Sequence, residues 1–561
     1  MADRTRATGA HPAPPRERFL YDYGKGGQWR SMGLRVALGF PAPYAVGMAN
    51  LAFQWIYHLM NRESGVRCDR FFLPGPGQIA PHTTTLETGR PLNEYDVVAF
   101  SLPFEPDYPN MVRLLRDGGV EPVAEKRHGA PLVIAGGVAV AANPEPVAAF
   151  LDAVAVGDAE PLMRELLEVL RGARGAESHA AKMELLAQCA AVPGMYVPAL
   201  YQVTHDSAGL VVARTARAGA PRVVRAVHLD SLAEPAHSPI VSDGAAFKDM
   251  FLVELSRGCP YKCRFCLTRH TASGFRAAPG QALAALVSDG ARIARRVGFV
   301  GTAFADAASM NATCKAAAHE QMRVSFSSIR LTDRVLALFR EWGAVIDNET
   351  LAIAPEAATE RMRRVLDKDL GAQLDKFLDS ELPERTRSVK MYYLLGAPGE
   401  RDEDVDAIAG EAQMAHRRLS ARGVGLSLSV NPMVAKAHTP MQWAEMPARN
   451  TIRNRLGGLK KQLAARPRIP VQGLGARDAE IQTMLSLGDR RLAPVIAHAA
   501  HSGGARAAWF KGLSQNSLSL DFYVRRKRDT SEILPWDVID HGMSRAKLYS
   551  QFQDIMSLAE I

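Results

Sequence analysis

Short apolar runs alternate with amphipathic stretches through the first third of the chain. The runs are continuous rather than alternating, a pattern typical of parallel strands buried on both faces. We predict strands at 34–40, 69–73, 96–102, 131–135 and 153–156, and helices at 50–61 and 108–116. This alternation of strands and helices predicts an α/β, Rossmann-like domain over residues 31–190.

A second series of strands and helices begins at Phe251. Its expected strands are 251–255, 299–303, 324–328, 351–354, 388–395 and 426–430, and its expected helices include 359–367 and 402–417. About six such units within residues 246–450 predict an open, partial (β/α)6 barrel, shorter than an eight-unit barrel. Residues 191–245 are expected to form a β-rich connector and residues 451–561 a mostly helical C-terminal region.

The amino-acid composition limits the class of protein. With 561 residues, 47% hydrophobic and 23% charged, the chain has the composition of a soluble globular protein. No apolar run approaches the roughly 18–20 residues needed to cross a bilayer, so no membrane partner is expected. Residues 1–30 contain many Ala, Pro and Arg residues and lack the apolar core of a signal peptide. We therefore expect a mobile leader and a cytoplasmic protein.

The net charge of +9 would suit an anionic partner. Lys and Arg are nevertheless dispersed, and the densest run, Arg525 to Arg528, is expected to be a solvated face rather than a binding patch. No RNA-binding signature accompanies it, which argues against a nucleic-acid partner.

The six cysteines are too few and too uneven in spacing for a disulfide framework. Cys68, Cys189 and Cys314 are scattered, and we expect them to be buried thiols. The other three follow a predicted strand in FLVELSRGCPYKCRFCLTRH.

Cys259, Cys263 and Cys266 have the spacing Cys-x-x-x-Cys-x-x-Cys. Three thiolates can hold three irons of a [4Fe–4S] cluster, which leaves the fourth iron free for S-adenosylmethionine. The alternative is a zinc site completed by His270, four positions after Cys266. A triple that opens an α/β domain favours the cluster, because structural zinc sites prefer paired cysteines in small modules.

Longer stretches extend the pattern over nearly the whole chain. They are PAPYAVGMANLAFQ, DVVAFSLPFEPDYPN, PLVIAGGVAVAANPEP, AVAVGDAEP, LAIAPEAATERMRRVLDKDL, VKMYYLLGAPGERDEDVD, HTPMQW, LGDRRLAPVI and LPWDVIDHG. In this order, and with the cysteine triple, they resemble the radical S-adenosylmethionine superfamily, specifically members with an N-terminal cobalamin-binding domain.

The resemblance implies that Cys259, Cys263 and Cys266 bind the cluster and that Phe265 lies against the adenine. At the strand end FVGTA, relatives often carry Gly-Gly-Glu for the methionine amino group, and this chain lacks that Glu. Ser327 and Arg330 are candidates for the methionine carboxylate or the ribose.

One further residue and one turn each have two possible interpretations. Glu356 either hydrogen-bonds the ribose or is an acidic residue in the first turn of a helix, where the helix dipole favours it. The turn Gly396 to Glu400 either lies near the adenine or is a strand-to-helix turn alone.

The cobalamin assignment depends on the N-terminal domain. Gly136 and Gly137 would let a corrin or its nucleotide tail approach the backbone closely; the alternative is a tight turn in an empty domain. The cobalt-ligating motif Asp-x-His-x-x-Gly is absent, and His58 is interpreted as a helix residue rather than as a cobalt ligand.

The resemblance predicts a methyltransferase that uses S-adenosylmethionine, a [4Fe–4S] cluster and methylcobalamin, with an external one-electron reductant. Its substrate would be an unactivated carbon or a phosphinate phosphorus of a small biosynthetic intermediate. The phosphinate P-methyltransferases of antibiotic biosynthesis are a narrower resemblance, in which Lys390 and Arg330 would line an anionic pocket. The alternatives are a radical cyclase or rearrangement enzyme without net methyl transfer, and a zinc-stabilised binding module.

Overall fold

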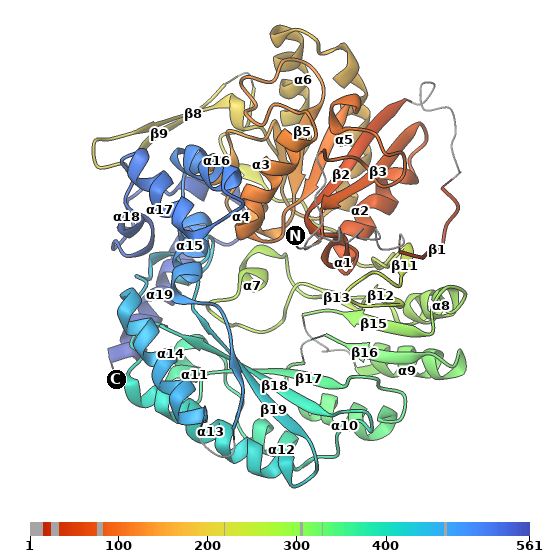
Figure 1. The fold of residues 1–561 in the computed structure, drawn as a ribbon, viewed down its shortest axis with the longest axis vertical. Coiled ribbons are helices and arrows are strands. Elements are labelled where there is room, and N and C mark those ends of the chain that lie inside the picture. The colour runs from red at the N-terminus through yellow and green to blue at the C-terminus, as the bar shows by residue number, and fades with distance from the viewer. Residues whose placement is uncertain are drawn as a thin grey trace, which may run out of the picture.

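The N-terminal part of the protein is built on a six-stranded sheet (Figure 1). The computed structural model describes residues 15–23, 33–75, 82–217, 219–302, 307–327, 329–464 and 468–560. The sheet order is β3-β2-β4-β5-β6-β7, and all pairs are parallel except β6 with β7. Its strands are β2 (Leu34–Pro43), β3 (Val66–Leu73), β4 (Val97–Ser101), β5 (Leu132–Gly136), β6 (Ala153–Ala155) and β7 (Met195–Tyr196).

Helices cover both faces of this sheet. They are α1 (Tyr44–Gly47), α2 (Leu51–Asn61), α3 (Tyr108–Asp117), α4 (Val138–Ala142), α5 (Ala159–Leu170) and α6 (His179–Ala191). α2 and α5 pack side by side. The right-handed rule for parallel crossovers places α3 on the opposite face, where it packs against β2 and a C-terminal helix. The predicted α/β class is confirmed.

β3 begins three residues before the predicted strand at 69–73. The three residues that the prediction missed include Arg67, whose guanidinium donates to the buried Asp69 carboxylate. A charged residue between Val66 and Cys68 interrupts the apolar run from which a buried strand is predicted.

The second half of the fold is a curved array of six parallel strands, which we call the strand array. They are β12 (Met250–Glu254), β15 (Arg296–Val300), β16 (Arg323–Phe326), β17 (Thr350–Glu356), β18 (Ser388–Leu395) and β19 (Gly425–Pro432). A parallel bridge between Ile329 and Ile353 joins the three-stranded and four-stranded sheets, and β20 (Val471–Gln472) extends the latter. The predicted strand at 299–303 is shifted, since β15 ends at Val300; Ala303 and Ser328 lie outside the described residues.

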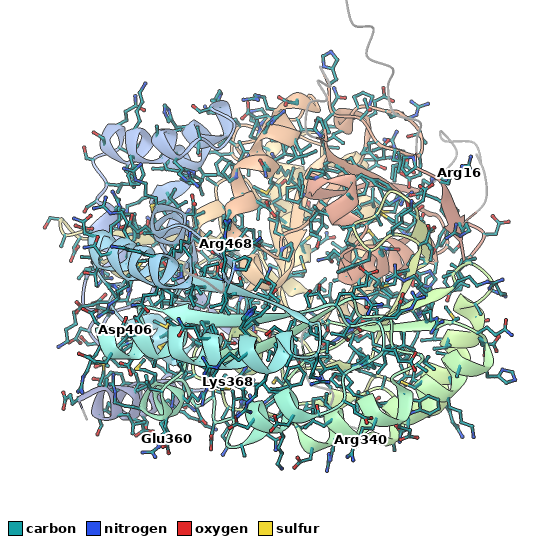
Figure 2. All side chains as sticks on the ribbon, turned by 60° about the horizontal axis from the view of Figure 1, so that its bottom comes forward. Arg16, Arg340, Glu360, Lys368, Asp406 and Arg468 are labelled. Atoms are coloured by element: carbon teal, nitrogen blue, oxygen red, sulfur yellow. The ribbon has the colours of Figure 1, made fainter. Side chains whose placement is uncertain are left out.

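The helices of the array cover its outer side (Figure 1). They are α8 (Gly280–Gly290), α9 (Ala307–His319), α10 (Asp333–Trp342), α11 (Glu360–Leu366), α12 (Gln373–Asp379) and α13 (Asp402–Ser420). In Figure 2, Arg340, Glu360 and Asp406 mark their outer, charged surface. Buried apolar side chains of the strands and helices form one continuous core.

The chain after the array returns to the first sheet. Its helices are α14 (Arg449–Ala464), α15 (Ala476–Ser486), α16 (Ala493–His501), α17 (Arg506–Gln515), α18 (Leu520–Val524) and α19 (Arg545–Glu560). α16 packs on α3, and α15 to α18 share a hydrophobic core with the six-stranded sheet. Figure 1 shows these helices along one side of the molecule, spanning from the sheet to the array.

The segment between the sheet and the array contains short strands: β8 (Tyr201–His205), β9 (Val211–Ala216), β10 (Val224–Arg225) and β11 (Ile240–Ser242). β8 and β9 form an antiparallel hairpin, and β10 pairs in parallel with β21 (Ile539–Asp540) near the C-terminus. This pairing brings residues near 228 and 541 to the same part of the molecule.

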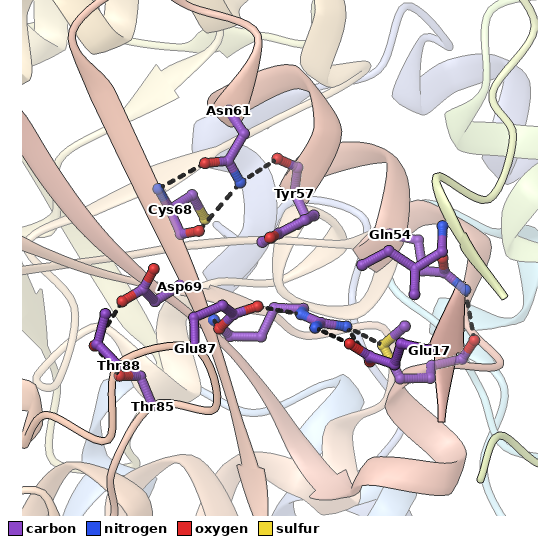
Figure 3. A network of polar contacts seen from close by, with 12 residues as sticks. Glu17, Gln54, Tyr57, Asn61, Cys68, Asp69, Thr85, Glu87 and Thr88 are labelled. Atoms are coloured by element: carbon purple, nitrogen blue, oxygen red, sulfur yellow. Dashed lines mark hydrogen bonds and ion pairs between the residues drawn. The ribbon is translucent and has the colours of Figure 1, made fainter. Parts of the chain in front are cut away.

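The predicted mobile leader differs from the structure over part of its length. Residues 1–14 and 24–32 lie outside the described residues, but β1 (Glu17–Phe19) pairs antiparallel with β11. Glu17 and Glu87 both pair with Arg70, whose side chain is 1% exposed, at 2.7 and 2.6 Å (Figure 3). A buried guanidinium needs carboxylate partners, so the ion pair between Arg70 and Glu17 anchors β1 to the sheet domain.

The predictions for the scattered cysteines and for the basic run have different outcomes. Cys68, Cys189 and Cys314 are buried free thiols, as predicted. The Arg525 to Arg528 run is not a solvated face: Arg525 pairs with Glu480, and Arg528 is buried, donating to the Tyr523 carbonyl oxygen. Burial lowers the pKa of Arg528 to about 9. Among the helices of the described ranges, none is long and apolar enough to cross a membrane.

Candidate active site

The three clustered cysteines lie in a loop at the carboxyl end of β12. A two-residue antiparallel pairing of β13 (Ser256–Arg257) with β14 (Arg276–Ala277) closes the loop, and α7 (Leu267–Thr271) begins directly after Cys266. Gly258 has a φ of 74°, and a Cβ there would lie 1.7 Å from the Gly274 carbonyl oxygen. The glycine is therefore required for the loop to close.

The thiol groups are free and largely shielded from water. Cys263 is buried, while Cys259 and Cys266 are partly exposed. Burial raises the pKa of both Cys263 and Cys266, because a low-dielectric surrounding disfavours the thiolate.

Two cations oppose this effect at Cys263. Lys368 and Arg330 lower its pKa, and Arg330 Nη1 lies 3.5 Å from Cys263 Sγ. The Arg330 guanidinium stacks on the Tyr261 ring at 3.8 Å from its centroid, which holds it over the loop. A set of three thiols flanked by two cations fits an anionic thiolate-bound iron–sulfur cluster.

The alternative zinc ligand, His270, points elsewhere. Its Nδ1 lies 2.8 Å from the Cys266 carbonyl oxygen, and its Nε2 faces Gln551 Oε1 at 3.4 Å. Within the described ranges, no three metal-ligating side chains gather closely enough to enclose one ion. In a [4Fe–4S] cluster three thiolates bind three different irons, so the cluster does not need the fourth protein ligand that a zinc site would take from His270.

Glu356 lies beside the same cations. Its carboxylate is 3.5 Å from Lys368 Nζ, and burial raises its pKa while Lys368 and Arg330 oppose the rise. Glu356 has a φ of 67°, an unusual conformation for a residue with a side chain, at an irregularity of the β17 pairing. The alternative of a first-turn helix acid is wrong, because α11 begins only at Glu360 with Thr359 as its N-cap.

The other predicted contacts are more dispersed. Phe265 packs against a small apolar cluster that includes residues of α11 and α19. Ser327 is exposed, and its hydroxyl lies 3.4 Å from the Gly301 carbonyl oxygen, at the strand end that lacks the expected Glu. Thr302, in that same strand end, donates to the Gly258 carbonyl oxygen and thereby joins it to the cysteine loop.

The Gly396 to Glu400 turn contacts the C-terminal helix. A Cβ on Gly399 would lie 2.4 Å from Ala559 Cβ, so α19 can approach only a glycine at this position. Glu400 accepts a hydrogen bond from the Gly396 amide at 2.7 Å and pairs with Arg455, and burial raises its pKa to about 7.

A cavity of about 440 Å³ extends from the cysteine-bearing side of the array into the N-terminal sheet domain. Its inner part lies between α2, α5 and the strands that they cover, and it includes Leu38, Met60 and Leu166. Its mouth is lined by Gly136, Gly137 and, across from them, Thr268 and Thr271 of α7.

The cavity is elongated along the sheet. Leu51 and Met60 both line it, and nine residues of helix correspond to about 13 Å at 1.5 Å per residue. Nucleotides in open α/β sheets usually bind outside the carboxyl ends of the strands. This cavity is instead also lined by residues of α2 and α5, the helices that lie over the sheet.

Gly136 and Gly137 differ in what they allow at the cavity mouth. Gly137 has a φ of 118°, and a Cβ would lie 2.7 to 2.9 Å from backbone atoms of Leu102. A Cβ on Gly136 would make only ordinary van der Waals contact, at 3.7 Å from Ala155 Cβ. Packing therefore requires a glycine at position 137 but not at position 136.

A buried ionic cluster joins the cavity wall to the cysteine loop. Arg257, two residues before Cys259, binds Glu160 of α5 through two hydrogen bonds of 2.9 and 3.0 Å. It also binds Glu254 at 2.9 Å and Asp158 at 3.2 Å. Sequence reasoning missed this cluster, because its members are remote in sequence and each is an ordinary charged residue in isolation.

His58, the histidine considered in the sequence analysis, is not among the residues that line the cavity. His58 is buried in α2, with its Nδ1 2.7 Å from the Tyr23 hydroxyl oxygen and its ring stacked 4.4 Å from Tyr21. Burial lowers the pKa of His58 to about 4. The histidines that line the cavity are His228, from the connector, and His541, from the C-terminal region.

The comparisons with known proteins begin with the N-terminal sheet domain. Residues 52–198 match the family described as "Radical SAM proteins, N-terminal". The match is to a domain of radical S-adenosylmethionine (radical SAM) proteins, a class that implies S-adenosylmethionine and a [4Fe–4S] cluster, and it ends before the cysteine loop. The chain is also similar to an uncharacterized protein of Methanocaldococcus jannaschii. The two are 24% identical over 413 residues, which cover 73% of this chain and 79% of the relative.

Proposed function

We propose that the protein is a cobalamin-dependent radical SAM methyltransferase. It would act on an unactivated carbon or a phosphinate phosphorus of a small intermediate. The observation that carries the proposal is the elongated cavity, which runs from beneath α2 and α5 to the helix that begins at Cys266. A cofactor seated there would lie against α7, the helix that follows the thiol loop.

The residues of the loop would hold the cluster and S-adenosylmethionine. Cys259, Cys263 and Cys266 supply three thiolates, while Arg330 and Lys368 offset their charge. Bound together, the cluster and S-adenosylmethionine supply a 5′-deoxyadenosyl radical when an external reductant donates one electron. Glu356, buried beside Lys368, would accept hydrogen bonds from the ribose.

The sheet domain would hold cobalamin. The inner, apolar part of the cavity would take the nucleotide tail, and the corrin would lie against the backbone of Gly136 and Gly137, which line the cavity. The ionic cluster around Arg257 would hold the cavity wall and the cysteine loop in a fixed position relative to each other. Arg257 lies at the start of the loop and pairs with Asp158 and Glu160 of the cavity wall.

An anionic substrate is the narrower part of the proposal. Arg330 already contacts Tyr261 and Cys263, so Lys390 is the better candidate for a substrate anion. Lys390 is half-buried on β18, with its Nζ 5.4 Å from the Tyr392 ring centroid. A small phosphinate or carboxylate would pair with this ammonium group.

Anaerobic reconstitution with iron, sulfide and hydroxocobalamin tests the proposal. With candidate substrates and a reductant, a methyltransferase forms 5′-deoxyadenosine and S-adenosylhomocysteine together, and the product gains one carbon. Deoxyadenosine without S-adenosylhomocysteine would instead indicate a cyclase or rearrangement enzyme. The Cys263→Ala variant should form no deoxyadenosine, whereas Cys189→Ala, which removes a buried thiol outside the loop, should retain activity.

A further inference from the structure

The chain segment around the three cysteines carries a surplus of positive charge. Residues 255–288 contain no Asp or Glu and five cations, which are Arg257, Lys262, Arg264, Arg269 and Arg276. Arg257 and Arg276 pair with carboxylates of the ionic cluster at the cavity wall. Among the described residues, no carboxylate lies within ion-pair distance of the other three. These three positive charges are therefore left uncompensated by carboxylates of the described chain.

Arg264 is held by groups that do not cancel its charge. Its Nη1 lies 2.8 Å from the Arg364 carbonyl oxygen and 3.2 Å from the Val365 carbonyl oxygen, in the last turn of α11. These carbonyl dipoles orient the guanidinium, but each carries only a partial negative charge. The contacted segment, residues 364–369, contains two cations and two acids and so adds no net charge.

Residues 260–264 form the exposed part of the cysteine loop, which we call the loop face. Pro260 and Lys262 are exposed, whereas Cys263 is buried directly beside them. Other sides of the loop contact protein: α7 lines the cavity, and His270 faces Gln551 of α19 at 3.4 Å. Consecutive Cα atoms are about 3.8 Å apart, so a partner that touches Lys262 lies one residue from a cluster ligand. The loop face is thus a short route from solvent to the cluster.

We infer that the loop face docks an acidic one-electron carrier protein, which is the external reductant of the proposed function. The inference rests on that function for the presence of the cluster. A thiolate-bound cluster is anionic and would repel an acidic carrier, and the uncompensated cations beside it oppose this repulsion. One electron passes from the reduced carrier to the cluster, so the carrier is oxidised, the cluster is reduced, and no bond forms or breaks. Electron-transfer complexes commonly have small interfaces, which suits a face of a few residues.

Stopped-flow reduction of the anaerobically reconstituted, full-length protein tests the inference, with a fully reduced flavodoxin of acidic surface as the carrier. The readout is the long-wavelength absorption that the flavin gains when it loses one electron, so no substrate turnover is needed. At low ionic strength, Lys262→Glu should slow the second-order rate by about tenfold or more, because complementary charge accelerates association by about 10- to 1,000-fold. The difference should largely disappear in ~1 M salt, where the Debye length is about 3 Å.

Two variants and a second reductant are the controls. Lys511→Glu makes the same change of net charge at an exposed lysine of α17 and should keep the wild-type rate. Lys262→Arg retains the positive charge and should keep the rate as well. The methyl viologen radical cation gains nothing from a basic docking face, so it should reduce Lys262→Glu no more slowly than wild type. Equal iron content checks that each variant folds and holds the cluster.

Zero-length carbodiimide cross-linking locates the contact directly. It should join Lys262, and not Lys511, to a flavodoxin carboxylate, as identified by mass spectrometry of the cross-linked peptides. Cross-links confined to lysines outside the loop face would overturn the inference.

The kinetic results can also overturn it. Equal slowing in Lys262→Glu and Lys511→Glu would show that only the net charge matters, and an unchanged rate in Lys262→Glu would exclude the loop face. Slower reduction of Lys262→Glu by methyl viologen would assign the defect to the cluster rather than to docking. A wild-type cluster that methyl viologen reduces and flavodoxin does not would overturn the docking alone. Failure of the wild-type protein to form any cluster would overturn the proposed function instead.

Discussion

Replacing Gly137 by Ala tests how the cavity mouth is built. At φ 118° and ψ 156°, Gly137 occupies a region of backbone space that is essentially restricted to glycine, and other residues pay about 1–3 kcal/mol there. The added Cβ would also lie 2.7 Å from the Leu102 carbonyl carbon and 2.9 Å from its nitrogen. Backbone atoms of a buried strand end cannot move aside as a flexible side chain can. We therefore expect a total cost of about 3 kcal/mol or more.

The neighbouring residue is a matched control. Gly136→Ala places the same methyl group 3.7 Å from the nearest atom and requires no change of φ. We expect its effect on stability to remain below about 1 kcal/mol. Because Gly136 lines the cavity, the added methyl group should weaken cobalamin retention instead.

Native-state hydrogen exchange measures the difference. The Leu102 amide, which donates to the Gly136 carbonyl oxygen at 2.7 Å, and the amides of β4 and β5 report opening of this part of the sheet. A loss of 3 kcal/mol corresponds to about hundredfold faster exchange. Equal exchange rates in the two variants, or unchanged rates in Gly137→Ala, would refute the steric argument.

Three further predictions follow from the site. Cys263→Ser should lose most of its bound iron and acid-labile sulfide after anaerobic reconstitution, while Cys189→Ser should retain both; equal metal contents would exclude the thiol loop as the cluster site. Glu160→Gln should lower the free energy of unfolding in urea by about 2 kcal/mol, because it weakens a buried charged contact. Glu234→Gln, in an exposed pair, should cost less than about 1 kcal/mol, and equal costs would contradict this reasoning. The raised pKa of Glu400 means that the folded protein binds this proton more tightly than the unfolded chain. Stability should therefore fall by about 3 kcal/mol between pH 4.5 and about 7. Urea unfolding of Glu400→Gln should show a correspondingly shallower fall, and an identical slope would refute the assignment.

Much of the strand and helix pattern follows from local sequence. β18 coincides with the predicted strand at 388–395, and α2 begins one residue after the predicted helix start. Buried parallel strands have long apolar runs, and helices have their own period, so both leave a signal within a few residues of sequence. The prediction was less accurate where a charged residue interrupts the apolar run, as Arg67 does at the start of β3.

The sequence by itself determined the candidate chemistry, because the three cysteines lie within eight residues and their spacing survives any arrangement of the rest of the chain. Only the tertiary structure decided their surroundings. Arg330 and Lys368 reach the thiols from separate segments after β16 and α11, and the cavity forms where α2, α5 and α7 meet. Such contacts are set by strand order and packing between distant segments, and a single sequence carries no local pattern for them.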